Sequence, residues 1–198
     1  MSADAATLAF YEAQAPRYTM DSAAGPNRHL DGFLDRLEPG AQILELGCGA
    51  GRDAARMTER GFIVDATDGA SAMVHKTQER FNLPARQMRF DELDSTEQYD
   101  AVWAHACLLH VGRDALPQVL SSIGKALRPG GWHYASFKLG TGEGRDLLGR
   151  LHNFPDPEWI TRAYLEVGFS IVEAVQYPGK GADGTMRDWI ALTCRMPR

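Results

Sequence analysis

The feature that most constrains the fold is a glycine-rich turn at residues 45–51, ELGCGAG, which joins an apolar segment to a helical one. Residues 41–46, AQILEL, have the apolar character of a buried strand, and residues 52–60, RDAARMTER, have the composition of a helix. Glycines between a strand and a helix place backbone N–H groups at the positive end of the helix and remove side chains that would block a ligand. The turn therefore predicts a nucleotide-type site.

Strand-like and helix-like segments alternate from residue 41 to about residue 138. After the turn, the sequence predicts a strand at 62–67, a helix at 71–81, a short strand within 85–90, a strand at 99–106, a helix with an apolar stripe at Leu116, Leu120, Ile123 and Leu127, and a strand at 131–138. We expect Asp114 to cap this last helix and Pro117 to lie in its first turn. The alternation is typical of strand–helix–strand units and a parallel sheet.

The pattern changes after residue 138. A Gly-rich connection at 139–154 precedes a helix that opens at Asp156 and Pro157, and two strands follow at 170–175 and 188–193. The segment between these strands allows antiparallel pairing but is too short for a crossover helix. The sequence thus predicts an α/β fold, a doubly wound, Rossmann-like three-layer sandwich with one reversed strand near the C-terminal end of a mostly parallel sheet.

Composition narrows the class of partner and compartment. The chain of 198 residues carries 26 acidic and 21 basic residues, and its formal net charge of −5 disfavours nucleic acid and favours a small metabolite. The cysteines Cys48, Cys107 and Cys194 form no CxxC pair, which fits a reducing compartment. No secretory signal pattern or run of 18 apolar residues occurs. We expect a cytoplasmic protein that does not bind a membrane.

Asp68 supports the nucleotide site, because it ends the second expected strand, beside the glycine turn. An acid at this position accepts hydrogen bonds from both hydroxyls of an adenosine ribose. Asp is also a common N-cap, and a cap for the helix at 71–81 is the competing structural role.

Two further residues separate two classes of cofactor. A dinucleotide motif, GxGxxG, requires a third glycine at the position of Arg52, which weakens an NAD site. Glu45 has an evident use in binding a cofactor that bears an ammonium group, because a carboxylate neutralises that charge.

These motifs resemble those of class I S-adenosylmethionine-dependent methyltransferases. ELGCGAG matches their E/DxGxGxG motif, Asp68 stands at the position of their ribose-binding acid, and YDAVWAHACLLHV and ALRPGGWHYASF resemble their fourth and fifth strand regions. The resemblance covers about residues 41 to 138. The compact architecture is similar to small-molecule enzymes of types 11 and 12 and of the tellurite-resistance-like kind. The resemblance implies S-adenosyl-L-methionine as cofactor, a small-molecule acceptor and a seven-stranded sheet that ends in an antiparallel hairpin.

The resemblance also implies a single domain over residues 1–198. It comprises an N-terminal helical cap or lid at 1–40, a cofactor-binding core at 41–138, and a substrate loop with the C-terminal hairpin at 139–198. The cofactor-binding residues implied in this way are Tyr11, Tyr18, Glu45, Gly47, Cys48, Gly49, Asp68, Gly69, Met73, Phe90, Asp91, Ala104 and His105.

Methyl transfer from a sulfonium is an in-line displacement that depends mainly on proximity and orientation and requires no metal. A general base is needed only when the acceptor must lose a proton. His105 and His110 flank ACLL at the end of the fourth strand and are the candidate catalytic residues, with pocket shape or a backbone hydrogen bond as the competing role. Lys138, Arg145 and Arg187 are candidates to face an anionic acceptor, although exposed cations usually only solvate the surface.

Two other functions stay open. One is an NAD-dependent oxidoreductase on a related fold, and the other is a non-catalytic S-adenosylmethionine-binding protein. Glu45 and Arg52 favour the methyltransferase over the oxidoreductase, but the sequence does not separate an active enzyme from a binding protein. The identity of the acceptor and the oligomeric state do not follow from the sequence.

Overall fold

The computed structural model describes residues 4–20 and 25–198, and for residues 18–20 it describes the backbone alone. Seven of its strands form one sheet in the order β3-β2-β1-β4-β5-β9-β8, and β6 pairs with β7 in a separate small sheet. The strands are β1 (Gln42–Leu46), β2 (Ile63–Asp68), β3 (Arg86–Gln87), β4 (Tyr99–Ala104), β5 (Leu127–Lys138), β6 (Gly144–Arg145), β7 (Leu151–His152), β8 (Ser170–Lys180) and β9 (Met186–Arg195).

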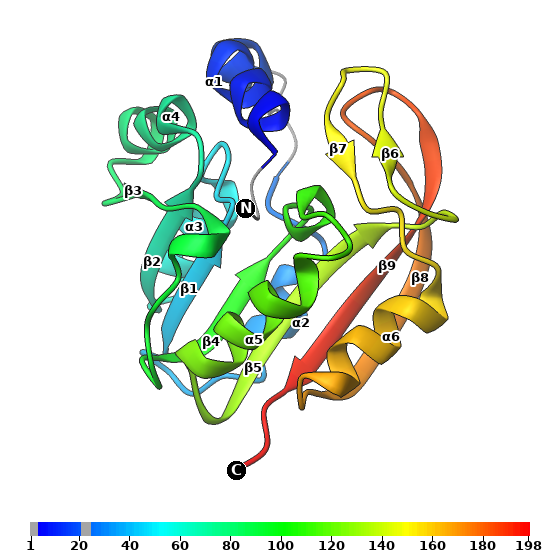
Figure 1. The fold of residues 1–198 in the computed structure, drawn as a ribbon. Helices are drawn as coiled ribbons and strands as arrows, with labels where there is room; N and C mark the ends of the chain where they lie inside the picture. Colours follow the sequence, from blue (N-terminus) through cyan, green and yellow to red (C-terminus); the bar gives the residue numbers. More distant parts are fainter. Residues whose placement is uncertain (1–3, 21–24) are drawn as a thin grey trace.

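The helices are α1 (Ala5–Met20), α2 (Leu30–Leu34), α3 (Arg52–Glu59), α4 (Ser71–Phe81), α5 (Leu116–Ala126) and α6 (Pro157–Glu166), with short 3-10 helices η1 (Phe90–Glu92) and η2 (Leu108–His110). Figure 1 shows α1 above the end of the sheet at which the parallel strands finish. None of the helices in the described residues is both long and apolar enough to cross a bilayer.

The sheet has its topological switch point at β1. This strand pairs in parallel with β2 on one side and with β4 on the other, so the chain winds away from it in both directions. Ligands of doubly wound sheets bind in the crevice at the carboxyl ends of the strands at such a point. At the far side of the sheet, β9 is antiparallel to both β5 and β8. The predicted fold class, including the single reversed strand, is confirmed.

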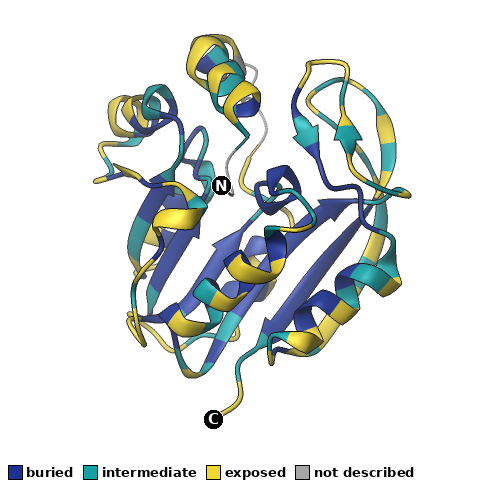
Figure 2. Ribbon diagram, viewed as in Figure 1, coloured by how far each residue is buried: buried dark blue, intermediate teal, exposed yellow. Residues whose placement is uncertain are grey.

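Helices cover both faces of the sheet. On one face, α5 and α6 bury apolar side chains such as Leu120 and Ile160 against the strands. On the other face, Phe33 of α2 and Met57 of α3 pack around Trp103 of β4. Figure 2 shows the central strands fully buried and the outward sides of the helices exposed, as the amphipathic pattern predicts.

The C-terminal hairpin is longer than the sequence suggests. The pairing of β8 with β9 continues past the expected strand ends through Tyr177 with Trp189 and Gly179 with Arg187. Only a short turn around Gly184 therefore separates the two strands, where the sequence predicted a loop over residues 176–187. The extended part of this hairpin reaches the same end of the sheet as α1.

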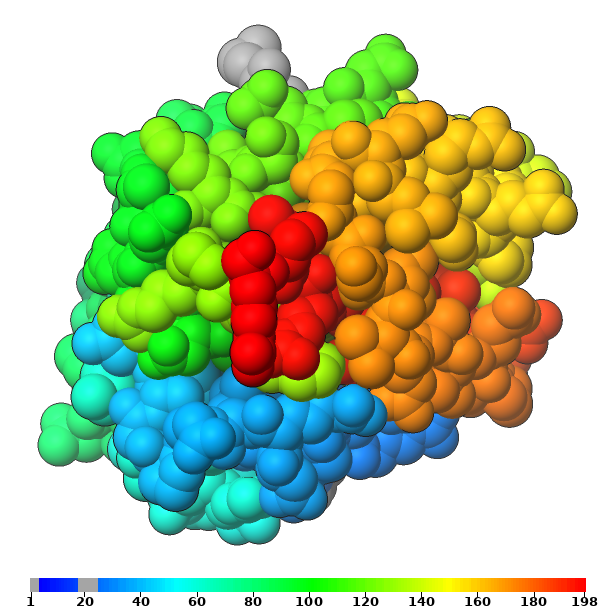
Figure 3. Space-filling model, turned by 90° about the horizontal axis from the view of Figure 1, so that it is seen from below, coloured from blue at the N-terminus to red at the C-terminus, as the bar shows by residue number. Residues whose placement is uncertain are grey.

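The opposite end of the sheet is closed by the C-terminal residues. Figure 3 shows this face, with the last residues in red packed between other parts of the chain. The Gly130 N–H donates to the carbonyl of Pro197, and the Met196 N–H donates to the carbonyl of Gly131, both at 2.9 Å. These contacts tie the C-terminal segment to the turn before the main part of β5.

The two expected helix caps have different outcomes. Asp156 is the N-cap of α6, because its side chain accepts a hydrogen bond of 2.8 Å from the Trp159 N–H. The prediction for Asp114 is wrong. The N-cap position of α5 belongs to Ala115, and no side chain caps that helix. The turn after η2 places Asp114 one residue too early to reach the free N–H groups.

We expect Asp156→Ala to lower the free energy of unfolding by about 1 kcal/mol, because the first turn of α6 loses its cap. Asp114→Ala is the matched control and should change it by less than about 0.5 kcal/mol. Urea denaturation followed by circular dichroism measures both. Equal losses in the two variants would contradict the assignment of the caps.

Candidate active site

A cavity of about 480 Å³ lies at the carboxyl ends of the parallel strands, below α1. One side of its wall comes from the glycine turn after β1 and the ends of β2 and β4. The other side comes from Asn27 and Arg28 before α2 and from Tyr177, Lys180 and Trp189 of the hairpin β8–β9. Both sides thus meet at the topological switch point, where the sheet order predicts a ligand site.

The glycine turn is shaped by packing on one side and by the cavity on the other. Gly47 has a φ of +70°, and a Cβ there would lie 2.5 Å from the Cβ of Cys107. Gly49 also has a positive φ, of +54°, but an added Cβ would meet only a carbonyl oxygen at 4.0 Å. The first glycine is therefore required by the close approach of Cys107, whereas the second leaves the cavity open.

Glu45 has a buried carboxylate without a cation beside it. Its side chain is only 3% exposed, and Oε2 has no hydrogen-bond partner among the described residues. Burial is the main reason that its pKa is raised well above the ordinary value, and the nearby charges of Asp53 and Asp68 raise it further. A ligand cation at this position would satisfy the carboxylate.

Asp68 lies at the end of β2, next to the glycine turn. Its two oxygens accept hydrogen bonds from the backbone N–H groups of Gly49, at 3.0 Å, and Ala70, at 2.9 Å. The N-cap position of α4 belongs to Ala70, so the cap role is not the one that Asp68 fills. Desolvation outweighs these hydrogen bonds and raises the pKa of Asp68 to about 6.

Most residues implied by the resemblance line the cavity. These are Tyr11, Glu45, Gly47, Cys48, Gly49, Asp68, Gly69, Phe90, His105 and His110. Three others do not. Met73 is buried against Ala15 and Ala70, Ala104 is in the core beneath α5, and Asp91 faces Arg89 at 3.6 Å. The side chain of Tyr18 lies outside the described part of the chain.

Sequence reasoning missed the residues that line the second half of the cavity. Asn27 and Arg28 carry no motif, and Tyr177, Lys180 and Trp189 lie in or next to the segment that was expected to be a loop. The available signal was topological. A strand parallel to β5 must end at the ligand edge of the sheet, so the last residues of β8 were candidates for that edge.

His105 follows β4 and contacts two polar residues. Ser136 Oγ lies 2.9 Å from its Nδ1, and Asn27 Nδ2 lies 3.1 Å from Nδ1 and 3.0 Å from Nε2. An amide nitrogen only donates, so a neutral ring accepts from Asn27 at the nitrogen that carries the lone pair, and the Ser136 hydroxyl can donate or accept to suit either tautomer. Burial lowers the pKa of His105, which keeps the ring neutral.

His110 is part of a chain of hydrogen bonds. Its Nδ1 donates to the Leu151 carbonyl at 2.6 Å, since a carbonyl can only accept. Burial and then the neighbouring His152 lower the pKa of His110 to about 3, so Nε2 has a lone pair and accepts from the Tyr11 hydroxyl at 2.9 Å. Arg150 Nη1 donates to the Tyr11 oxygen at 2.7 Å. This arrangement favours a positioning role for His110 rather than proton transfer.

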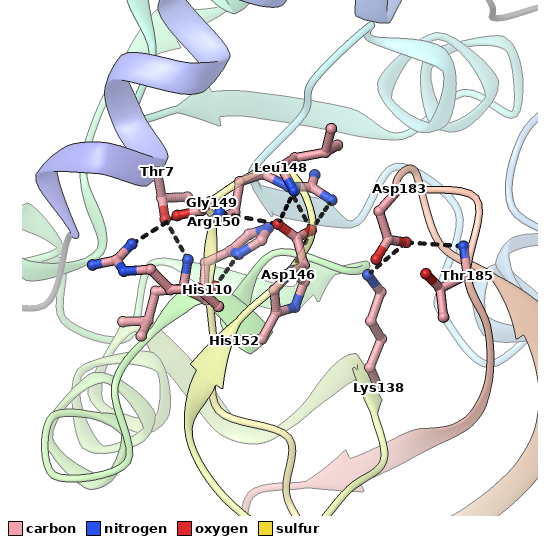
Figure 4. A network of polar contacts seen from close by, with 12 residues as sticks. Thr7, His110, Lys138, Asp146, Leu148, Gly149, Arg150, His152, Asp183 and Thr185 are labelled. Carbon is pink, nitrogen blue, oxygen red and sulfur yellow. Dashed lines mark hydrogen bonds and ion pairs between the residues drawn. The ribbon is translucent and has the colours of Figure 1, made fainter.

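The Gly-rich connection that was expected to be a loop contains the hairpin β6–β7, organised by one buried acid. Asp146 Oδ2 accepts hydrogen bonds from Arg150 Nη2 at 2.6 Å and from His152 Nε2 at 3.1 Å. All three side chains are no more than 2% exposed. Figure 4 shows them gathered beside His110, with Lys138 and Asp183 to one side. Asp146 thus holds Arg150 where it reaches Tyr11.

Asp146→Asn should lower the free energy of unfolding by about 3 to 5 kcal/mol, because it leaves the buried Arg150 charge uncompensated. Glu79→Gln removes one partner of the exposed Lys76 ion pair and should cost less than about 0.5 kcal/mol. Urea denaturation compares the two.

Desolvation opposes ionisation of Asp146, but the hydrogen bonds from Arg150 outweigh it and lower the pKa to about 2. The stabilisation by Asp146 is therefore full above about pH 4 and is lost as the pH falls toward 2. A loss in Asp146→Asn as small as that in Glu79→Gln would contradict the structural role of this buried ion pair.

The comparisons with known proteins agree, because the matches described below are all to methyltransferases. Residues 43–131 match the model of a methyltransferase domain. An uncharacterized methyltransferase of Mycobacterium bovis is 35% identical over 118 residues, which cover 57% of this chain and 59% of that protein. A trans-aconitate 2-methyltransferase of Deinococcus radiodurans is 30% identical over 115 residues, covering 56% of this chain and 43% of that protein. The matched segment thus spans less than two thirds of either relative.

The fold is shared over a longer stretch. The structure of a Burkholderia thailandensis 1,6-didemethyltoxoflavin-N1-methyltransferase, with that compound and S-adenosylhomocysteine bound, superposes with a TM-score of 0.80. The superposition covers 98% of this chain and 88% of the other at 21% identity. Together with the glycine turn and the acids beside it, these matches show that residues 43–131 resemble a methyltransferase domain and that the chain shares its fold with S-adenosylmethionine-dependent methyltransferases.

Proposed function

We propose that this protein transfers a methyl group from S-adenosylmethionine to a small-molecule acceptor. The observation that carries the proposal is the buried Glu45 carboxylate beside the glycine turn, whose Oε2 has no hydrogen-bond partner among the described residues, with Asp68 at the end of the neighbouring strand. The cofactor bears both an ammonium group and a ribose, so its chemistry fits both acids. Glu45 would face the ammonium group, directly or through water, and Asp68 would accept from the ribose hydroxyls.

When bound, S-adenosylmethionine supplies an electrophilic methyl group on a sulfonium. The residues of this chain then have to exclude water and hold the acceptor in line with the methyl group. Tyr11 and His105 both line the cavity and are suited to positioning. His105 would also take a proton from a hydroxyl or amine acceptor, because its ring is neutral and one ring nitrogen has a lone pair. Its contact with Asn27 would be exchanged for the acceptor.

The names of the relatives support a small acceptor, since trans-aconitate and 1,6-didemethyltoxoflavin are both small molecules. We further propose that residues 1–198 work as one unit, with 1–40 as cap, 41–138 as cofactor-binding core and 139–198 as acceptor-binding part. A reducing, cytoplasmic compartment belongs to the same proposal, because the three cysteines are buried, free thiols.

Calorimetric titration with S-adenosylmethionine, S-adenosylhomocysteine and NAD tests the proposal. We expect saturable binding of the first two and none of NAD. Binding of NAD alone would favour the oxidoreductase. A non-catalytic protein would bind S-adenosylmethionine but transfer no methyl group to any acceptor.

Asp68→Asn should weaken binding of S-adenosylhomocysteine by about 1.5 to 3 kcal/mol, the range for lost hydrogen bonds to a charged group. Asp91→Asn makes the same chemical change outside the cavity wall and should leave the affinity unchanged. Calorimetry measures both dissociation constants. An unaltered affinity in Asp68→Asn would mean that this acid serves only the backbone N–H groups of Gly49 and Ala70.

The affinity for S-adenosylhomocysteine should also fall as the pH is lowered through about 6. The pKa of Asp68 is raised to about 6, so at pH 5 most of the ligand-free protein is protonated there and affinity drops on the order of tenfold relative to pH 7.5. Titrations across this range measure the effect. In Asp68→Asn the loss of affinity at low pH should be smaller. An equally steep loss in this variant would mean that a group other than Asp68 is responsible.

A further inference from the structure

We propose that the methyl acceptor is a planar small molecule with a carboxylate, which binds at the end of the cavity formed by Arg28 and the hairpin β8–β9. The inference rests on the proposed function, because it assigns the second half of the same cavity. It follows from the distribution of charge in the wall and from the shape of the wall.

Acids and cations are unevenly distributed in the wall of the cavity. Glu45 and Asp68 lie next to the glycine turn together with Arg52 and Arg89, whereas the half formed by the N-terminal segment and the hairpin contributes the exposed cations Arg28 and Lys180. One more carboxylate, that of Asp53, lines the cavity, and its two oxygens are engaged by the Asn27 N–H at 2.8 Å and by Trp103 Nε1 at 2.9 Å. The hairpin half contributes no acid of its own to the wall.

The two cations of the hairpin half lack carboxylate partners. Other arginines of this protein form ion pairs, such as Arg86 with Asp65 at 2.8 Å. Neither Arg28 nor Lys180 has such a partner within the described residues, although both line the cavity. The Arg28 guanidinium lies 4.1 Å from the centre of the Tyr177 ring, which fixes it in the wall.

A second layer of charged groups lies behind this wall. Lys138 is 2% exposed and its Nζ has no hydrogen bond, with the Asp183 carboxylate 3.7 Å away. Figure 4 shows Lys138 extending from the end of β5 toward Asp183. The Arg187 guanidinium lies over the Phe154 ring at 4.6 Å, and its Nε also lacks a partner. Asp183 and Asp146 both act electrostatically on Lys138, opposed by Arg150 and Arg187, so this layer contains two acids as well as its cations.

The charges in the hairpin half of the cavity favour a carboxylate over a phosphate. Arg28 and Lys180 contribute two positive charges, and the Asp53 carboxylate offsets one of them. The remaining single charge balances a carboxylate, whereas a phosphate group carries close to two negative charges at neutral pH.

The shape of the wall favours a planar molecule. Tyr177 and Trp189 are cross-strand neighbours whose rings are inclined by only 10° with centroids 6.4 Å apart, and both line the cavity. Gly179 allows β8 to lie against the edge of the indole, since a Cβ there would be 2.8 Å from Trp189 Nε1. Two nearly parallel aromatic rings form a flat apolar surface, on which a planar ligand stacks.

The test is calorimetry on protein saturated with S-adenosylhomocysteine. The probes are 4-hydroxybenzoate and nicotinate, their amides 4-hydroxybenzamide and nicotinamide, the non-planar cyclohexanecarboxylate, and phenyl phosphate. We expect the planar acids to bind at least tenfold more tightly than their amides, than the non-planar acid and than the phosphate. The proposal is overturned if the amides or the phosphate bind as tightly, or if neither planar acid binds.

Charge-matched variants locate the effect. Arg28→Gln with Lys180→Gln should abolish the preference for acids over amides. Lys125→Gln with Arg162→Gln removes the same charge from exposed positions on α5 and α6, outside the cavity wall, and should keep the preference. Both double variants should bind S-adenosylhomocysteine as the parent does. A preference that survives in the first variant refutes the proposal, whereas failure of the parent protein to bind S-adenosylhomocysteine refutes the proposed function instead.

Discussion

The structure depends on the burial of two carboxylates, Glu45 and Asp68, at the ends of adjacent strands. Desolvation raises the pKa of both, so the ionised form of each carboxyl group is disfavoured when no ligand is bound. The sheet holds them there regardless, because β1 and β2 pair in register and Thr67 Oγ1 donates to the Glu45 carbonyl at 2.7 Å. The free energy of the core thus compensates for a site whose electrostatics are completed only by a ligand with positive charge and hydroxyl groups.

The helix above this site is attached to two separate parts of the chain. Glu12 of α1 accepts hydrogen bonds from the Ser71 and Ala72 N–H groups at the start of α4, where a carboxylate is favoured by the helix dipole. The preceding residue, Tyr11, accepts a hydrogen bond from Arg150, which lies just before β7. These contacts hold α1 over the cavity, which Tyr11 itself lines.

The sequence predicted what depends on local chemistry. The strand–turn–helix units and the Asp156 cap follow from residue type and spacing, and the structure has them. It did not predict what depends on distant partners. Asp146 is organised by buried contacts within a segment whose glycines indicate a loop. The position of Met73 on its helix does not tell whether the side chain lines the cavity or packs beneath α1, where the structure places it.

The distinction between local chemistry and distant contacts also applies to the residues that would select the proposed acceptor. The family match covers residues 43–131, which contain the glycine turn and Asp68. Tyr177, Lys180 and Trp189 lie beyond it, on a hairpin brought to the cavity because β9 is reversed and β8 ends at the ligand edge. These three side chains take no part in the packing of Gly47 against Cys107. They can therefore change without loss of the cofactor site, so the acceptor has to be inferred from the charge and shape of this chain's own hairpin.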